Sequence, residues 1–231
     1  MSRSLLAAVV AAFAALMPAA AWAQAGPTLT FDKPCYAKGD PMEYSGTGFT
    51  PGGEVNFLFG SLSNQSTGTY DTSADATGAI GGSIEAPSED DVLDDGDDSG
   101  TVGASANDRT RIDQGAPPEQ QFAGTTFRLT RWDVDVRRPG GGAPKARRPM
   151  RITAIGFTRV VGRPLYVQYR RGNRTLKAVR LGRLGGECGD LTRTIPRGLP
   201  RGLRPGRYTL MFTTSPRAVN GERVWFKQTL R

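Results

Sequence analysis

The chain contains two segments with the same local pattern, and this internal repeat limits the possible folds more than any other feature. Ser45–Phe59 reads SGTGFTPGGEVNFLF, and Thr153–Tyr169 reads TAIGFTRVVGRPLYVQY. Each has a small residue, Gly-Phe-Thr, a short polar stretch and then alternating apolar residues. Gly48 and Gly156 are 108 positions apart, which is too long for a solenoid repeat and typical of a whole domain. We therefore expect two copies of one domain, at residues 27–130 and 131–231.

Short runs of alternating apolar and polar residues in both copies predict β-strands separated by Gly- and Pro-rich turns. We expect strands at 28–33, 42–49, 54–60, 68–73, 79–86, 100–106 and 125–130, and again at 132–137, 151–158, 164–171, 174–180, 190–195, 206–213 and 223–230. This pattern predicts an all-β protein with two tandem immunoglobulin-like β-sandwiches. The Gly-Phe-Thr repeat would then be structural: it ends the second strand, which should face the third strand from the opposite sheet.

Two quoted segments of the first copy resemble a known group of modules. CYAKGDPMEYSGTGFTPGGEV and TSADATGAIGGSIEAP are similar to the tandem immunoglobulin-like modules of exported proteins from high-GC bacteria. Gly48–Gly53 and Asp75–Gly78 carry the resemblance, whereas the second copy departs from it at Arg159–Gly162. Such modules serve as surface display, spacer or binding domains without one shared activity, so the resemblance implies a fold and leaves the ligand open.

The N-terminus has the features of a secretory signal peptide. Arg3 precedes the apolar run Leu5–Met17, and Ala21-Trp22-Ala23 places small residues at the two positions that a signal peptidase reads. We expect residues 1–23 to be removed and the protein to be secreted or held at the cell surface. The alternative is a membrane anchor, but the run is short for a bilayer, and no later stretch is apolar enough to span one.

Charge is divided between the two copies. Residues 24–130 contain 17 acids and 5 bases, and residues 131–231 contain 5 acids and 24 bases. In a sandwich of seven strands, alternate loops gather at one end, and three such loops of the second copy would bring nine bases together. We expect these to bind a polyanion: Lys145, Arg147, Arg148, Arg170, Arg171, Arg174, Arg197, Arg201 and Arg204.

The expected partner is an anionic cell-wall polymer or polysaccharide. Nucleic acid is disfavoured because no series of aromatic residues interleaves the bases. The alternative is that the arginines reflect genomic composition and solubility and hold no ligand. The acidic run Glu89–Asp98 could instead meet basic loops of the second copy at the junction, which include Arg159, Arg163, Arg183, Arg217 and Arg223.

Residue content argues against most enzymatic chemistry. The chain has no histidine and two cysteines, which removes Ser-His-Asp and Cys-His catalysis and His-ligated or four-thiolate metal sites. Glu89–Asp98 groups carboxylates in a loop, whereas a glycosidase holds two of them rigidly across a cleft. The same run begins like a calcium loop at Asp95 but has Ala106 where a bidentate Glu would stand. We expect no catalytic residue, metal or cofactor, and keep a calcium-dependent carbohydrate-active enzyme and a purely structural module as alternatives.

The two cysteines occupy different positions in the two copies. Cys35 follows the first strand of the first copy, and Cys188 precedes the fifth strand of the second. Neither copy can form a disulfide of its own, yet the topology places both residues at the junction between the copies. An oxidising compartment favours closure of such a pair, so we expect a Cys35–Cys188 disulfide, with two unpaired or intermolecular thiols as the alternative.

Overall fold

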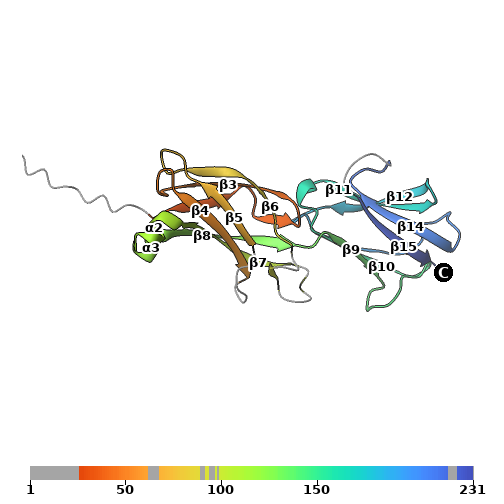
Figure 1. Ribbon diagram of the computed structural model, residues 1–231. Coiled ribbons are helices and arrows are strands. Elements are labelled where there is room, and N and C mark those ends of the chain that lie inside the picture. Colours follow the sequence, from red (N-terminus) through yellow and green to blue (C-terminus); the bar gives the residue numbers. More distant parts are fainter. Residues whose placement is uncertain are drawn as a thin grey trace, which may run out of the picture.

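The computed structural model describes residues 26–61, 68–88, 92–93, 97, 99–217 and 223–230, and almost all of the regular structure in them is β-strand. The strands form four sheets. The predicted signal peptide and most of the acidic run Glu89–Asp98 lie outside the described residues. Figure 1 shows an elongated molecule in which one sandwich follows the other along the chain.

The N-terminal sandwich has a sheet of three strands packed on a sheet of five. The first has the order β1-β3-β6 and the second the order β2-β8-β7-β4-β5. Their bounds are β1 Thr28–Phe31, β2 Cys35–Ala37, β3 Pro41–Thr47, β4 Glu54–Ser61, β5 Gly68–Ser73, β6 Ile80–Glu85, β7 Ser99–Asp108 and β8 Phe122–Thr130. β2 is parallel to β8, and the other pairs are antiparallel. Two short helices, α2 (Arg109–Asp113) and α3 (Pro118–Gln121), connect β7 to β8.

The C-terminal sandwich has a sheet of three strands packed on a sheet of four. The orders are β13-β10-β9 and β12-β11-β14-β15, and all pairs are antiparallel. The bounds are β9 Asp133–Arg137, β10 Met150–Ile155, β11 Pro164–Arg171, β12 Arg174–Arg183, β13 Leu191–Ile195, β14 Gly206–Thr213 and β15 Arg223–Leu230, with a 3₁₀ turn, η1, at Thr158–Val160. This strand order is that of an immunoglobulin-like sandwich, as predicted.

Each sandwich encloses its own hydrophobic core. The first core runs from Leu29 to Leu129 along the chain, and the second from Val134 to Leu230. Both are built by period-2 alternation, since every second residue of a strand points inward. In β3 and β4, Met42 and Phe57 are fully buried and belong to opposite sheets, as the sequence pattern predicted. The division into two domains at residue 130 stays a prediction.

The Gly-Phe-Thr repeat has the same structural role in both sandwiches. Gly48 and Gly156 have φ angles of 85° and 74°, which end β3 and β10, and the following Phe49 and Phe157 are buried in the two cores. A Cβ atom on Gly156 would lie 2.1 Å from the carbonyl oxygen of Arg131. Glycine is therefore required where the connection between the sandwiches passes this turn.

Four strands have the predicted bounds, namely β5, β11, β14 and β15, and most others differ by a few residues. Four elements were not predicted, namely β2, α2, α3 and the 3₁₀ turn η1. β2 places Cys35 in a strand rather than a loop, and α2 and α3 occupy a segment where we predicted no element. The α2 helix begins at Asp108, whose carboxylate accepts from the backbone N–H of Arg111 and from that of Thr50 at 2.6 Å. Asp108 thus ties this helix to the Gly-Phe-Thr turn.

Candidate functional site

The two sandwiches are joined by a disulfide between Cys35 and Cys188, with their Cα atoms 5.3 Å apart. Cys35 begins β2, and Cys188 lies in the connection between β12 and β13. Both residues are buried, with exposed fractions of 1% and 2%. The predicted disulfide is confirmed, and it links residues 153 positions apart in the sequence.

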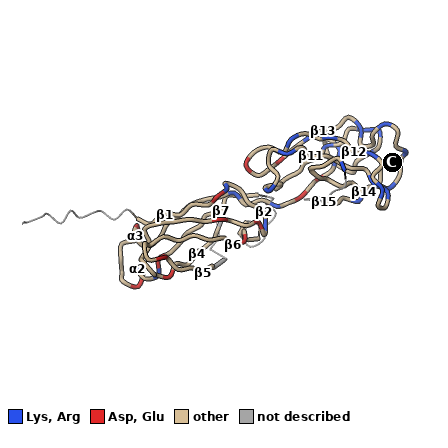
Figure 2. Tube along the Cα trace, turned by 90° about the horizontal axis from the view of Figure 1, so that it is seen from above, with Lys and Arg blue, Asp and Glu red and all other residues tan. Residues whose placement is uncertain are grey.

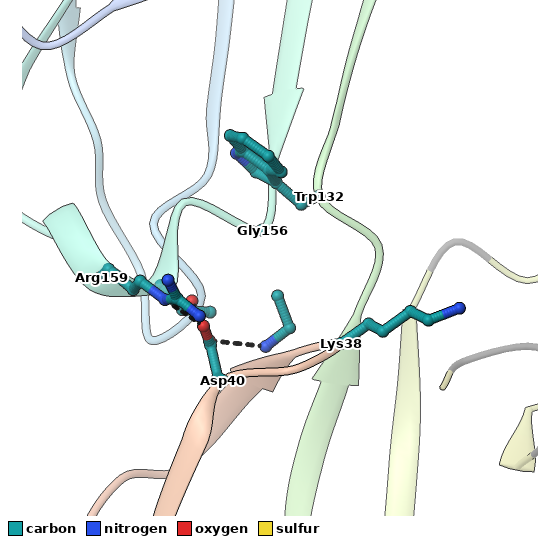
Figure 3. Close-up of a pocket in the computed structure, with 7 residues that line it drawn as sticks. Lys38, Asp40, Trp132, Gly156 and Arg159 are labelled. Carbon is teal, nitrogen blue, oxygen red and sulfur yellow. Dashed lines mark hydrogen bonds and ion pairs between the residues drawn. The ribbon is translucent and has the colours of Figure 1, made fainter. Parts of the chain in front are cut away.

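A buried carboxylate forms a second link at the junction. Asp40 is 2% exposed and accepts from the backbone N–H of Ala37 at 2.9 Å. The hydroxyl of Thr158, from the C-terminal sandwich, donates to the same oxygen, and Nε of Arg159 donates to the other oxygen at 2.5 Å. Arg159 also donates to the carbonyl of Gly39 at 3.1 Å. Figure 3 shows Arg159 and Asp40 pointing toward each other across the junction. Because both carboxylate oxygens of Asp40 accept hydrogen bonds, the free-energy cost of burying this charged group is offset.

A small cavity of about 160 Å³ lies beside this link. Its lining includes Lys38, Asp40, Trp132, Gly156 and Arg159. Trp132 contacts Phe157 edge-on, with ring centroids 6.2 Å apart, and is 45% exposed. Asp40, Thr158 and Arg159 in its wall are hydrogen-bonded across the junction, so the cavity belongs to the joint between the sandwiches.

The predicted polyanion-binding residues lie at the end of the C-terminal sandwich that is remote from the junction. We call this end the basic tip; it is formed by the β9–β10, β11–β12 and β13–β14 loops. Lys and Arg residues gather there in Figure 2. Eight of the nine predicted residues are exposed: Lys145, Arg147, Arg148, Arg171, Arg174, Arg197, Arg201 and Arg204.

Backbone hydrogen bonds hold the loops of the basic tip together. The N–H groups of Gly198 and Leu199 donate to the carbonyls of Arg148 and Ala146 at 2.8 and 3.0 Å. The buried hydroxyl of Tyr169 donates to the carbonyl of Gly198 at 3.0 Å, and burial raises the pKa of this phenol. Arg171 donates to the carbonyl of Arg204 at 3.4 Å. The three loops therefore form one surface whose guanidinium groups can face the same ligand.

Arg170 differs from the other eight. Its side chain is 8% exposed and donates to the carbonyl of Asn173 at 2.6 Å. Its guanidinium carbon lies 5.0 Å from the ring centre of Trp225 on β15. Arg170 is thus packed against the sheet rather than presented by the loops. Strand alternation contained the signal for this, because Tyr169 points into the core and its neighbour Arg170 must point to the outer face of the same strand.

Among the described residues, no group of three or more Cys, Asp or Glu side chains is arranged to hold a metal ion. No helix of the described part of the chain is long and apolar enough to cross a membrane. The acidic run that suggested calcium binding, and that could meet Arg159, Arg163, Arg183, Arg217 and Arg223, lies mostly outside the described residues. Arg159 instead pairs with Asp40.

No protein-family model matches the chain, and no curated protein matches its sequence. Among solved structures, macromomycin is similar over 44% of this chain and 97% of its own, with 16% identity and a TM-score of 0.31. A tetra-tandem repeat from the extending region of a large adhesion protein is similar over 89% of this chain and 49% of its own, with 14% identity and a TM-score of 0.30. The polymeric Ig receptor ectodomain of a teleost fish covers 87% of this chain and 97% of its own, with 9% identity and a TM-score of 0.31. These scores are too low to place the chain in the family of any of these proteins.

Proposed function

We propose that the protein is an exported binding or spacer module that holds two sandwiches in a fixed relation and presents the basic tip to an anionic surface polymer. The observation that supports it is the position of the eight exposed cations. They lie on three loops at one end of the C-terminal sandwich, and the other end is occupied by the disulfide and the Asp40 links. Because the disulfide and the Asp40 hydrogen bonds hold the opposite end of this sandwich, the basic tip is left to contact an external anionic surface.

The chemistry of the tip suits a polyanion. Guanidinium groups bind carboxylate, sulfate and phosphate through paired donors, and they stay charged at every physiological pH. The four Asp and Glu residues of the C-terminal half that the structure describes lie elsewhere, on β9 and in the connection between β12 and β13: Asp133, Asp135, Glu187 and Asp190. No carboxylate of the described residues lies on the three loops to cancel the positive potential of the tip.

Chromatography on immobilised heparin tests the proposal with the full chain. We expect R147S/R197S/R201S to elute at lower salt than the parent, because each lost contact reduces the number of counterions released on binding. The control R163S/R183S/R217S removes the same charge from exposed positions at the junction end of the same sandwich and should elute close to the parent. Equal elution of the two variants would show that net charge alone governs retention and would overturn the assignment to the tip.

Export has its own test. We propose that the signal peptide is cleaved after Ala23, so N-terminal sequencing of the exported protein should begin at Gln24. A protein that retains residues 1–23 and sediments with membranes would instead support the anchor alternative.

A further inference from the structure

The sheet β12-β11-β14-β15 carries only one sign of charge. Its four strands contain nine Lys and Arg residues and no Asp or Glu. The nine are Arg170, Arg171, Arg174, Lys177, Arg180, Arg183, Arg207, Arg223 and Lys227. The three-stranded sheet of the same sandwich, by contrast, carries Asp133 and Asp135 on β9. One sheet of this sandwich is thus cationic without internal neutralisation.

Strand register identifies the residues on the outer face of this sheet. On β15, Val224 and Phe226 pack against the core, so Trp225, Lys227 and Thr229 point outward. Cross-strand pairing then places these three in rows with neighbours on the same face. The rows are Trp225 with Met211 and Gln168, Lys227 with Thr209 and Arg170, and Thr229 with Arg207.

Trp225 lies over Arg170 on this face. The guanidinium carbon is 5.0 Å from the ring centre, which is a cation–π contact, and the ring is 48% exposed whereas Arg170 is 8% exposed. Nε of Arg170 is buried and has no hydrogen-bond partner among the described residues. The indole is therefore held in place from below by a buried cation, and much of its surface faces solvent.

A groove lies next to this pair. It has a volume of about 400 Å³, and its walls include Arg170, Arg171, Arg207, Thr209, Lys227 and Thr229. The guanidinium of Arg171 is fixed 4.9 Å from the ring centre of Tyr208 and donates to its hydroxyl at 3.2 Å. The groove thus combines cations in set positions with two threonine residues, beside an exposed aromatic ring.

We infer that this groove and Trp225 bind an acidic polysaccharide of the uronic acid type. One sugar ring of the polysaccharide stacks on the exposed indole. Carboxylates of neighbouring sugar units accept hydrogen bonds from Arg207 and Lys227, and sugar hydroxyls bond to Thr209 and Thr229. The inference rests on the proposed function in taking a polyanion as partner, but it assigns the specific contact to the sheet face rather than to the loops. A single-stranded nucleic acid site would stack successive bases on several aromatic residues, whereas the described outer face has one strongly exposed ring.

A short ligand distinguishes binding at this groove from binding at the basic tip. Hexagalacturonate is titrated into the full chain while tryptophan fluorescence is followed, with maltohexaose as the neutral control and oligo(dT) as the nucleic acid. We expect hexagalacturonate to change the fluorescence and maltohexaose to leave it unchanged. The change should disappear in W225F, because Trp225 is the ring that the sugar covers.

Matched variants then locate the contact. R207Q/K227Q should weaken hexagalacturonate binding about tenfold or more, since a charge-assisted hydrogen bond contributes strongly to affinity. R197Q/R201Q removes the same charge from the tip and should change it less than about threefold, while still lowering retention on long heparin. Unchanged thermal unfolding of both variants excludes misfolding as the cause.

Three outcomes would overturn the inference. They are equal binding by R207Q/K227Q and the parent, an unchanged fluorescence on addition of hexagalacturonate, and tighter binding of oligo(dT) than of the uronate through Trp225. If R207Q/K227Q binds hexagalacturonate like the parent while R197Q/R201Q loses heparin retention, the proposed function survives and the sheet-face site fails. If neither variant affects any polyanion, both fail.

Discussion

Asp40 and Arg159 belong to different sandwiches, and Nε of Arg159 donates to Oδ1 of Asp40 over 2.5 Å. The carboxylate side chain is 3% exposed and the guanidinium side chain 52% exposed. Removing Arg159 would therefore leave a buried carboxylate oxygen without its donor, whereas removing Asp40 would leave a guanidinium that water can solvate.

The first prediction concerns the two sides of this link. D40A should lower the free energy of unfolding by about 1–3 kcal/mol, because the N–H of Ala37 and the hydroxyl of Thr158 lose their buried acceptor. R159A should lower it by a comparable amount, about 1–3 kcal/mol, because Oδ1 of the buried Asp40 carboxylate loses its charged donor. The losses should not add in D40A/R159A, which removes the buried charge together with its partner. Urea unfolding of the three variants measures the losses, and a fully additive double variant would contradict the prediction.

The disulfide is tested by thiol counting. Unfolded, unreduced protein should contain no free thiol, and reduction should release two, those of Cys35 and Cys188. Because the bond links the two sandwiches, reduction should increase their relative motion, which small-angle scattering detects. C35S/C188S should scatter like the reduced parent and should not respond to reductant. A parent profile that reduction leaves unchanged would mean that the Asp40 links alone set the geometry.

Glycine at position 156 is expected to be required for a steric reason. Gly156 and Gly162 both have positive φ, 74° and 79°, but a Cβ on Gly162 meets nothing within 4 Å. G162A should therefore cost about 1 kcal/mol of stability, and G156A at least about 2 kcal/mol more. Thermal unfolding compares the two variants. Similar losses would show that the approach of Arg131 to this turn is not tight.

Stability should fall in acid partly through Asp75. Hydrogen bonds from the Thr77 hydroxyl and from the N–H groups of Ala79 and Thr77 lower the pKa of Asp75 below its ordinary value of 3.8. A carboxylate with a lowered pKa stabilises the fold above its unfolded pKa, and this contribution is lost as the pH falls through the folded pKa. Between about pH 5 and pH 2, D75N should therefore show a shallower loss of stability than the parent. Parallel curves would contradict this.

Local sequence determined the strands of this protein because alternation and turn residues act over a few positions. Val55, Phe57 and Phe59 occupy every second position of β4 and are buried. The Gly-Phe-Thr repeat ends β3 and β10 as expected, although both strands stop before Gly48 and Gly156, two to three residues earlier than predicted. The short strand β2 and the helices α2 and α3 escaped prediction. β2 exists because Cys35–Ala37 pairs with β8, and α2 begins where Asp108 caps it and anchors the turn at Thr50.

The sequence by itself also determined that the cysteines meet, because strand count and the order of the loops place both at the junction. Only the tertiary structure decided what surrounds them and where the cations point. Asp40 and Arg159 are 119 positions apart and meet through the packing of two sandwiches, which no local pattern encodes. Arg170 and Arg171 are adjacent in the chain, yet one is buried under Trp225 and the other faces solvent. The physical reason is that the alternation along a strand sets the face to which each side chain points, whereas its burial depends on the side chains that neighbouring strands place on the same face.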